Sequence, residues 1–292
     1  MANITAGMVK ELRERTGLGM MDCKRALTEA EGDMDKAIDD LRKASGIKAA
    51  KKASRVAAEG VVLTKIAEDG NYGVVIEVNS ETDFAARDDN FLDFSQHALE
   101  LAYSNSEADV AALLGAGLED TRSALVQKIG ENCNVRRVER LKFTDENAGI
   151  VESYVHSNNR IAVLISVTGG DEALARDVAM HIAAVNPLVV RAEDVPEEEI
   201  AKETEIYSAQ ARESGKPEEI IEKMISGRLR KFVAEVSLLE QPFVKDPDVT
   251  VGKLLKDADA SVVQFVRFEV GEGIEKEEID FADEVAAQVK GS

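Results

Sequence analysis

Apolar residues recur at helical spacing in three short runs within the first 45 residues of the chain. The first predicted helix begins after Thr5, whose side chain can cap it, and ends at Gly17. The second ends at Gly32, and the third begins after Asp33, another capping residue. A three-helix bundle this small is marginally stable alone, so we expect an attachment module. The apolar faces carry Met8, Val9, Leu12, Met21, Ala26, Leu27, Ala30, Met34, Ala37, Ile38 and Leu41.

A basic stretch over 42–55 overlaps the end of this module. It can be a patch for RNA or an acidic partner, or a solvated helix or linker rich in alanine and lysine. The stretch has no aromatic side chains to stack on bases, so we favour the solvated helix or linker. Its basic residues are Arg42, Lys43, Lys48, Lys51, Lys52 and Arg55.

The periodicity changes at Gly60. β-branched residues dominate 60–66 and 73–79, and turn-forming residues fill 68–72 between them. This pattern predicts a β-hairpin. Next in chain order, the pattern predicts a helix over 91–102, a helix over 118–129 and a strand over 135–141.

The same order of elements recurs in the second half of the chain. A second hairpin is predicted from 149–155 and 160–167, with its turn at 157–159, and a helix follows over 173–185. The matching third strand comes much later, at 262–270. Self-similarity of this kind indicates a duplicated unit. We therefore expect an α+β fold whose two core subdomains each contain an antiparallel sheet.

The second copy carries an insertion between its helix and its last strand. Residues 193–214 are acidic and helical in pattern, 215–217 break the helix, and 218–238 are helical again. Two helices joined by a tight turn form an antiparallel hairpin, which can project as an interaction arm or fold back onto the core. The sequence leaves both arrangements open. A last helix is predicted after Gly273, with Ile274, Ile279, Phe281, Ala282 and Val285 as its apolar residues.

These patterns divide the chain into successive units. The divisions are a three-helix module with linker over 1–55, a first core subdomain over 56–144, a second core subdomain over 145–190 and 231–273, the helical hairpin over 191–230, and a C-terminal helical module over 274–292. Charge supports the first boundary. Residues 1–60 hold 12 Lys and Arg against 10 Asp and Glu, whereas the whole chain of 292 residues has a net charge of −20.

The composition argues against several classes of protein. A net charge of −20 disfavours a general nucleic-acid binder, because neutralising phosphates requires clustered Lys and Arg. The two cysteines give neither a disulfide framework nor the spacing of a zinc site. The first residues do not resemble a signal peptide, and no run approaches the roughly 18 apolar residues of a membrane span. We therefore expect a cytoplasmic protein that makes no membrane contact.

Recognised motifs for catalysis or nucleotide binding are missing from the sequence. The glycine and lysine at 215–216 are followed by Pro217, which excludes a phosphate-binding loop there. The three histidines, His97, His156 and His181, are scattered, and none is paired with a cysteine or serine at a known motif spacing. We therefore expect no catalytic site, no bound metal and no cofactor.

The most unusual local sequence lies at 79–85, directly after a predicted strand. It places Asp83 beside the large apolar side chain of Phe84 at the entry to a helix. In one interpretation, Thr82 or Asp83 caps that helix and Phe84 packs on it as a hydrophobic staple. In the other, Phe84 enters a pocket of a partner protein while Asp83 contacts polar groups there. From the residues alone we favour the cap.

Five motifs, taken in order, are similar to those of a known family. The longest, at 9–27, resembles the N-terminal signature of elongation factor Ts, and the others lie at 82–84, 128–132, 179–183 and 268–274. The motifs are spread from residue 9 to residue 274, so the resemblance covers essentially the whole chain. By this resemblance the sequence is identified as a member of a family of guanine nucleotide exchange factors that act on the GTPase elongation factor Tu.

The resemblance implies a fold and a set of contact residues. The implied fold is a ubiquitin-associated-like three-helix bundle, a duplicated core, a helical hairpin able to form a homodimer, and a C-terminal helix that packs on elongation factor Tu. The family residues that displace Mg²⁺ are matched by Thr82, Asp83, Phe84 and Ala85. Ala85 and Ala86 stand where Val-Ala is common in relatives, which is a small change. Other contact positions of the family are matched by Arg13, Met20, Met21, Ile129, Gly130, His156 and His181.

Two other classes of function stand beside exchange. One is a ubiquitin-associated-type adaptor that binds a partner without exchange activity, although an adaptor would not need the duplicated core or the 82–84 segment. The other is an enzyme of unrecognised type, which would need polar groups converging in a pocket.

Overall fold

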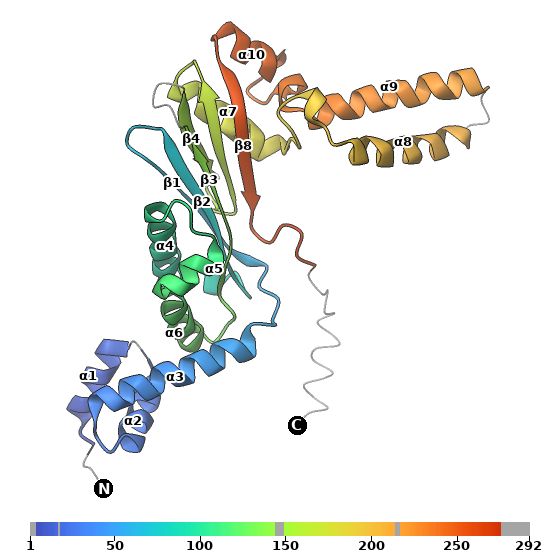
Figure 1. Ribbon diagram of the computed structural model, residues 1–292. Coiled ribbons are helices and arrows are strands. Elements are labelled where there is room, and N and C mark those ends of the chain that lie inside the picture. Colours follow the sequence, from blue (N-terminus) through green and yellow to red (C-terminus); the bar gives the residue numbers. More distant parts are fainter. Residues whose placement is uncertain (1–3, 17, 144–148, 214–216, 276–292) are drawn as a thin grey trace.

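The computed structural model describes residues 4–16, 18–143, 149–213 and 217–275. Figure 1 shows N-terminal helices at one end, two adjoining sheets in the middle, and a helical arm that extends away from the sheets. The mixed helix and sheet content confirms the predicted α+β class. Gly17, residues 215–216 and the part of the predicted C-terminal helix beyond 275 lie outside the described residues.

The N-terminal module folds as the capping residues predict. The side-chain oxygen of Thr5 accepts a hydrogen bond from the backbone N of Met8 at 3.3 Å. That of Asp33 accepts one from the backbone N of Lys36 at 3.0 Å. Each bond satisfies an amide of a first helical turn that has no partner within the helix. The helices are α1 (Ala6–Thr16), α2 (Met20–Glu29) and α3 (Met34–Lys52).

Helix α3 is longer than predicted and is not a solvated linker. It continues through Lys52 and packs against α6 (Glu119–Ile129), so the basic stretch belongs to a docked helix. Ala49 is buried within the hydrophobic cluster of the first subdomain. Ala49 and Ser45 of this stretch are buried, whereas Lys43, Lys48 and Lys51 are exposed, as in an amphipathic helix.

The first subdomain consists of a three-stranded antiparallel sheet covered on one face by helices. Its strands lie in the order β1-β2-β3. The predicted hairpin, the two helices and the returning strand are all present, and the short helix α5 was not predicted. The elements are β1 (Glu59–Ile66), β2 (Tyr72–Ser80), α4 (Asp89–Ser104), α5 (Val110–Leu113), α6 and β3 (Asn134–Lys142).

The second subdomain repeats this arrangement, which confirms the predicted duplication. Its sheet has the order β4-β5-β8 and is likewise antiparallel. Both sheets shift register at the same place, between Glu77 and Val78 in β2 and between Ser166 and Val167 in β5. The elements are β4 (Ile150–Val155), β5 (Ile161–Thr168), α7 (Glu172–Val185) and β8 (Ser261–Glu269), with β6 (Pro242–Phe243), β7 (Asp246–Thr250) and α10 (Val251–Asp257) as additions that were not predicted.

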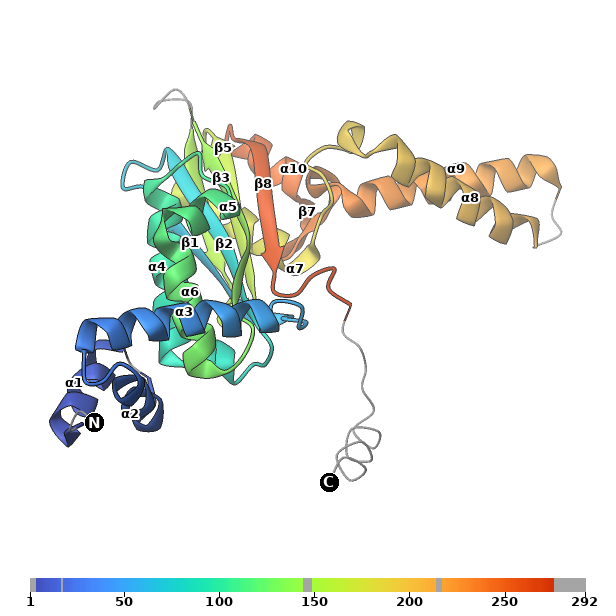
Figure 2. The same cartoon turned by 60° about the horizontal axis from the view of Figure 1, so that its bottom comes forward.

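The two sheets pack face to face, and the helices cover their outer faces (Figure 2). Side chains alternate along β2: Val74 and Ile76 join the cluster under α4, whereas Val75 joins the cluster between the sheets. Successive side chains of a strand point to opposite faces, so a strand buried on both faces is apolar throughout. The inter-sheet cluster consists of Val62, Val75, Leu141, Val151, Ala162, Leu164, Phe268 and Val270.

The inserted hairpin projects from the core instead of folding back onto it. Helices α8 (Glu197–Arg212) and α9 (Glu218–Val236) pack along each other and extend away from both sheets (Figure 1). Arg228 ties them together by donating a hydrogen bond to Gln210 at 2.6 Å and lying over the ring of Tyr207. None of the helices in the described part of the chain is long and apolar enough to cross a membrane.

The tight β1–β2 pairing at Gly60 provides a test of this fold. The φ of Gly60 is +145°, and a Cβ on this residue would lie 2.0 Å from the carbonyl oxygen of Val78. We expect Gly60→Ala to lower the free energy of unfolding by about 3 kcal/mol or more, because the strain and the clash add. Unfolding in urea, followed by circular dichroism, measures this change.

Gly46→Ala is the matched control, because Gly46 lies within α3 and a Cβ there would meet nothing within 4 Å. This substitution should raise stability by about 0.5–1 kcal/mol, since alanine loses less backbone entropy in a helix. Similar urea midpoints for the two variants would contradict the assigned backbone at Gly60.

Candidate functional site

The segment at 81–85, called the 81–85 loop below, forms an exposed corner between β2 and α4. Phe84 is 81% exposed, so the predicted hydrophobic staple is wrong. The predicted cap is present in altered form. The hydroxyl of Thr82 accepts a hydrogen bond from the backbone N of Ala85 at 3.2 Å and caps a short 3₁₀ turn, while Asp88 caps α4. The loop therefore turns its largest apolar side chain toward solvent.

Hydrogen bonds exchanged with the end of α6 hold this loop in place. The backbone N and the hydroxyl of Thr82 both donate to the carboxylate of Glu131, at 2.9 and 2.8 Å. In return, the backbone N of Asn132 donates to the carboxylate of Glu81 at 2.6 Å. We call these three bonds the loop brace. Charged acceptors make such bonds stronger than neutral ones, so the brace fixes the loop on a rigid element.

The brace brings Ile129 and Gly130 beside the 81–85 loop. Gly130 ends α6 with φ +87°, a left-handed conformation that favours glycine. Its carbonyl accepts a hydrogen bond from Lys52 at the end of α3, and Ile129 is half-buried against the first core cluster. Two motifs of the sequence, 48 residues apart at Thr82 and Gly130, are thus joined into one surface.

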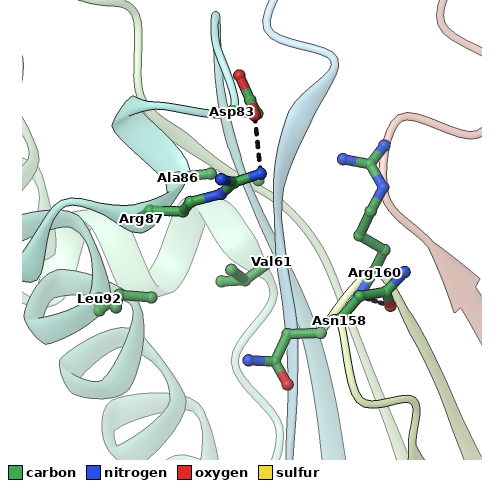
Figure 3. A pocket seen from close by; sticks show the side chains of 9 residues that line it. Val61, Asp83, Ala86, Arg87, Leu92, Asn158 and Arg160 are labelled. Carbon is green, nitrogen blue, oxygen red and sulfur yellow. Dashed lines mark hydrogen bonds and ion pairs between the residues drawn. The ribbon is translucent and has the colours of Figure 1, made fainter.

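Asp83 faces a cavity of about 400 Å³ between the 81–85 loop and the β4–β5 turn (Figure 3). Its carboxylate pairs with Arg87 at 2.9 Å. The opposite wall is the turn at 158–160, which is anchored because the backbone N of Val62 donates to the carbonyl of Asn159 at 2.8 Å. The lining residues are Gly60, Val61, Asp83, Ala86, Arg87, Leu92, Asn158, Asn159 and Arg160.

His156 begins this same turn and is exposed. Its Nδ1 lies 3.2 Å from the hydroxyl of Tyr154, and its backbone N donates to the carbonyl of Ile161. The turn therefore presents the imidazole on the subdomain that lies across the cavity from Asp83.

His181 is fully buried and cannot touch a partner directly in this conformation. Its Nδ1 accepts from the backbone N of Val244 at 3.2 Å, so its Nε2 donates to the side-chain oxygen of Gln241 at 2.9 Å. Burial lowers the pKa of His181, and the hydrogen bond to Gln241 opposes this shift only in part. The neutral imidazole therefore fixes the position of the turn at 241–244.

The N-terminal module presents a separate surface. Met20 and Met21 are 62% and 76% exposed at the start of α2, and Arg13 is exposed on α1. The assignment of Met21 to the apolar core of the bundle was therefore wrong. These three residues lie on helices α1 and α2, outside the 81–85 loop, and the end of α1 at Thr16 lies beside α4 and α6.

Comparison with known proteins gives a consistent result along the chain. The family model described as elongation factor TS matches residues 81–272. The elongation factor Ts of Hahella chejuensis is 65% identical over 291 residues, covering 100% of both chains. The chain belongs to the elongation factor Ts family. Elongation factor Ts from Saccharophagus degradans is 63% identical and covers 99% of each chain. The one from Alcanivorax borkumensis is 56% identical over 97% of this chain and 100% of its own length.

Several residues that shape this site in the elongation factor Ts fold were not predicted. Glu81, Glu131 and Asn132 form the loop brace, and the turn at 158–160 forms the far wall of the cavity. A signal was available for Glu131 and Asn132, because they lie inside the family motif at 128–132. Among the described residues, no group of three or more His, Cys, Asp and Glu is arranged to hold a metal ion.

Cys133 reports on the closure of the loop brace, because it directly follows Asn132 and is buried. Burial, together with the nearby charges of Glu131 and Glu81, raises the pKa of its thiol to about 12. We expect iodoacetamide at pH 8 to label it at least about 10³-fold more slowly than an ordinary thiol with a pKa near 8.5, because only the thiolate reacts.

Peptide mapping separates this label from any label on Cys23. Glu131→Gln should speed labelling of Cys133, since it weakens the brace and removes a charge that suppresses the thiolate. Labelling of Cys133 in the unmodified chain at the rate of a free cysteine would show that this region is open.

Proposed function

We propose that this protein is the guanine nucleotide exchange factor of elongation factor Tu. It binds the GDP form of that GTPase, displaces Mg²⁺, promotes release of GDP and allows GTP to enter during translation elongation. This role places it in the cytoplasm and needs no enzyme active site of its own. The observation that carries the proposal is the exposed Phe84 on a braced loop within a chain of the elongation factor Ts family.

The braced loop suits Phe84 to act as a wedge. An aromatic ring carries a large apolar area on only two side-chain torsions, which is why such residues dominate interface energetics. The bonds from Thr82 to Glu131 order the loop before any partner arrives. Because the loop is already ordered in the free protein, binding costs less conformational entropy, and more of the interaction energy is available to distort the partner.

Magnesium makes the partner's nucleotide site sensitive to a small displacement. A GTPase holds its nucleotide through phosphate contacts and a bridging Mg²⁺. Mg²⁺ requires near-ideal octahedral geometry with ligands at roughly 2.0–2.1 Å, so moving one ligand weakens the whole site. In our proposal Phe84 enters beside this site, Asp83 holds the displaced elements, and Thr82 and Ala85 shape the loop.

The remaining contact positions extend the interface on both sides of this wedge. Ile129 and Gly130 lie beside the loop, and His156 lies across the cavity on the second subdomain. His181 acts indirectly, by fixing the turn at 241–244. The N-terminal module adds a second contact through Arg13, Met20 and Met21. Contacts on separate units of one chain raise the effective concentration of each for the same partner.

Exchange then follows from linkage alone. If the protein weakens GDP binding by some factor, GDP weakens binding of the protein by the same factor. The protein binds, GDP leaves, GTP enters and the protein is expelled, with no covalent step. A homodimer formed through the projecting α8–α9 arm is a separate proposal, and sedimentation at several concentrations tests it.

The proposal is tested by the release of fluorescent GDP from elongation factor Tu at fixed Mg²⁺. Substoichiometric amounts of this protein should accelerate release of the whole nucleotide pool, because each molecule is used repeatedly. A pure adaptor would form a complex with elongation factor Tu and leave the release rate unchanged, and that outcome would overturn the proposal.

Phe84→Ala tests the wedge within this assay. Removing an interface hot spot costs about 2 kcal/mol or more, so exchange should slow at least about tenfold. The fold should be unaffected, because Phe84 is exposed. Val263→Ala is the matched control: Val263 is a partly exposed apolar residue on β8, outside the proposed interface, and its loss should leave exchange unchanged. Equal exchange rates for the two variants would refute the wedge.

A further inference from the structure

A buried carboxylate lies where the end of the second sheet meets the first. Glu77 of β2 is fully buried, and its carboxylate is surrounded by donors. Arg136 and Arg137 of β3 approach it at 3.0 and 2.5 Å, and Asn79 donates to it at 3.0 Å. The fourth donor is the backbone N of Gly271, at 2.8 Å. Glu77 therefore binds a segment 194 residues later in the chain.

The same arginines hold the segment that follows β8. Arg137 donates to the carbonyl of Glu269 at 3.0 Å and pairs with the carboxylate of Glu272 at 3.3 Å. Arg136 donates to the carbonyl of Glu272. On the other side, a Cβ on Gly271 would lie 2.3 Å from the carbonyl oxygen of Ala58, so backbone closes the space there. The path of residues 269–272 is thus clamped from both sides.

A β-bulge allows two consecutive arginines to reach one carboxylate. Glu77 is paired with Arg137 and Val78 with Val135, which leaves Arg136 as the extra residue of β3. Consecutive side chains of a regular strand point to opposite faces, and a bulge re-aims one of them. Both guanidinium groups therefore converge on Glu77.

The duplicated subdomain shows that the fold does not require this charge cluster. The second sheet has the same bulge, with Ser166 paired to Gln264, and Val167 to Val262. By this correspondence Ser166 stands where Glu77 does, and Val263 stands where Arg136 does. The second copy forms its sheet and bulge without any ion pair there. The charge cluster therefore has a role that is specific to the first copy. That role is to hold the segment after β8.

Glu77 also lies on the strand that leads to the 81–85 loop. Asn79, its hydrogen-bond partner, is three residues before Thr82 and is fully buried. One cluster thus sets both the start of the proposed wedge loop and the exit of the C-terminal segment. Burial acts to raise the pKa of Glu77. Hydrogen bonds from Gly271 and Asn79 and the charges of the arginines nevertheless hold this pKa below its usual value, so the carboxylate stays ionised.

We propose that Glu77, Arg136 and Arg137 form a clasp that fixes residues 269–272, called the C-terminal segment here, relative to the 81–85 loop. Glu77 is then a positioning residue for nucleotide exchange. This inference rests on the proposed function. Holding two contact elements at a fixed spacing lowers the entropy lost when both engage one partner. Loss of the clasp therefore weakens recognition of elongation factor Tu, whereas the wedge loop is still held by the separate bonds of the loop brace.

The test measures GDP release from elongation factor Tu against the concentration of the full-length protein. Glu77→Gln should raise the concentration needed for half-maximal acceleration by about tenfold, since preorganisation is lost, and leave the maximal rate within about twofold. Arg136→Gln should act in the same direction and is the milder change, because Arg136 is partly exposed. Glu152→Gln is the matched control: Glu152 is also buried and paired with an arginine, Arg176, but does not touch the C-terminal segment.

A double-mutant cycle separates positioning from general loss of stability. Combining Glu77→Gln with Arg136→Gln should add little to the effect of Glu77→Gln alone, because both side chains act in the same cluster on residues 269–272. Effects that multiply, a fall in the maximal rate, or an equal effect of Glu152→Gln would overturn the clasp.

Hydrogen exchange in the free protein tests the clasp without the partner. The amides of 270–272 are hydrogen-bonded and should exchange slowly in the unmodified chain. They should exchange at least about tenfold faster in Glu77→Gln and Arg136→Gln, because the Gly271 amide loses its acceptor or the segment loses its anchor. Unchanged protection in both variants would overturn the clasp. Absence of nucleotide release with the unmodified chain, despite this protection pattern, would instead overturn the proposed function.

Discussion

The face-to-face packing of two three-stranded sheets determines where the candidate contacts of the core lie. Because side chains between the sheets and beneath the covering helices are buried, the loops at the sheet ends are the places where the core can best present side chains to a partner. The packing places the 81–85 loop of the first copy across a cavity from the β4–β5 turn of the second. Elements from both halves of the chain thereby line one cavity.

Duplication followed by divergence explains how one unit acquired several roles. The first copy has developed the loop brace and the Glu77 cluster, whereas the second copy has gained the α8–α9 arm and a buried histidine at the base of that arm. His181 is buried and is linked through Gln241 to the carbonyl of Glu235 at the end of α9. In our proposal it therefore affects a partner only indirectly, through the position of α9 and of the turn at 241–244.

Much of this fold could be predicted from local pattern, because strands buried on both faces and capped helices leave a strong signal. The 60–66 and 73–79 hairpin and the helix around Phe91 are examples. The features that could not be predicted depend on tertiary partners. Helix α3 continues through Lys52 because Ala49 packs on the core, and β7 contains Pro247 and two aspartates that disfavour strands. The 81–85 loop that presents Phe84 is held through Thr82 by Glu131, a residue 49 positions from Thr82. The family resemblance indicated which residues matter, whereas the structure shows which of them are presented directly.

In the proposed mechanism, this protein and GDP weaken each other's binding to elongation factor Tu, and the braced loop transmits the effect. The most direct measurement is the affinity of the protein for elongation factor Tu with and without saturating GDP and Mg²⁺, compared with the affinity of GDP with and without the protein. The account predicts that both affinities fall by the same large factor, as linkage requires. Equal affinity of the protein for the GDP-bound and nucleotide-free forms would contradict the account, because binding could then not promote nucleotide release.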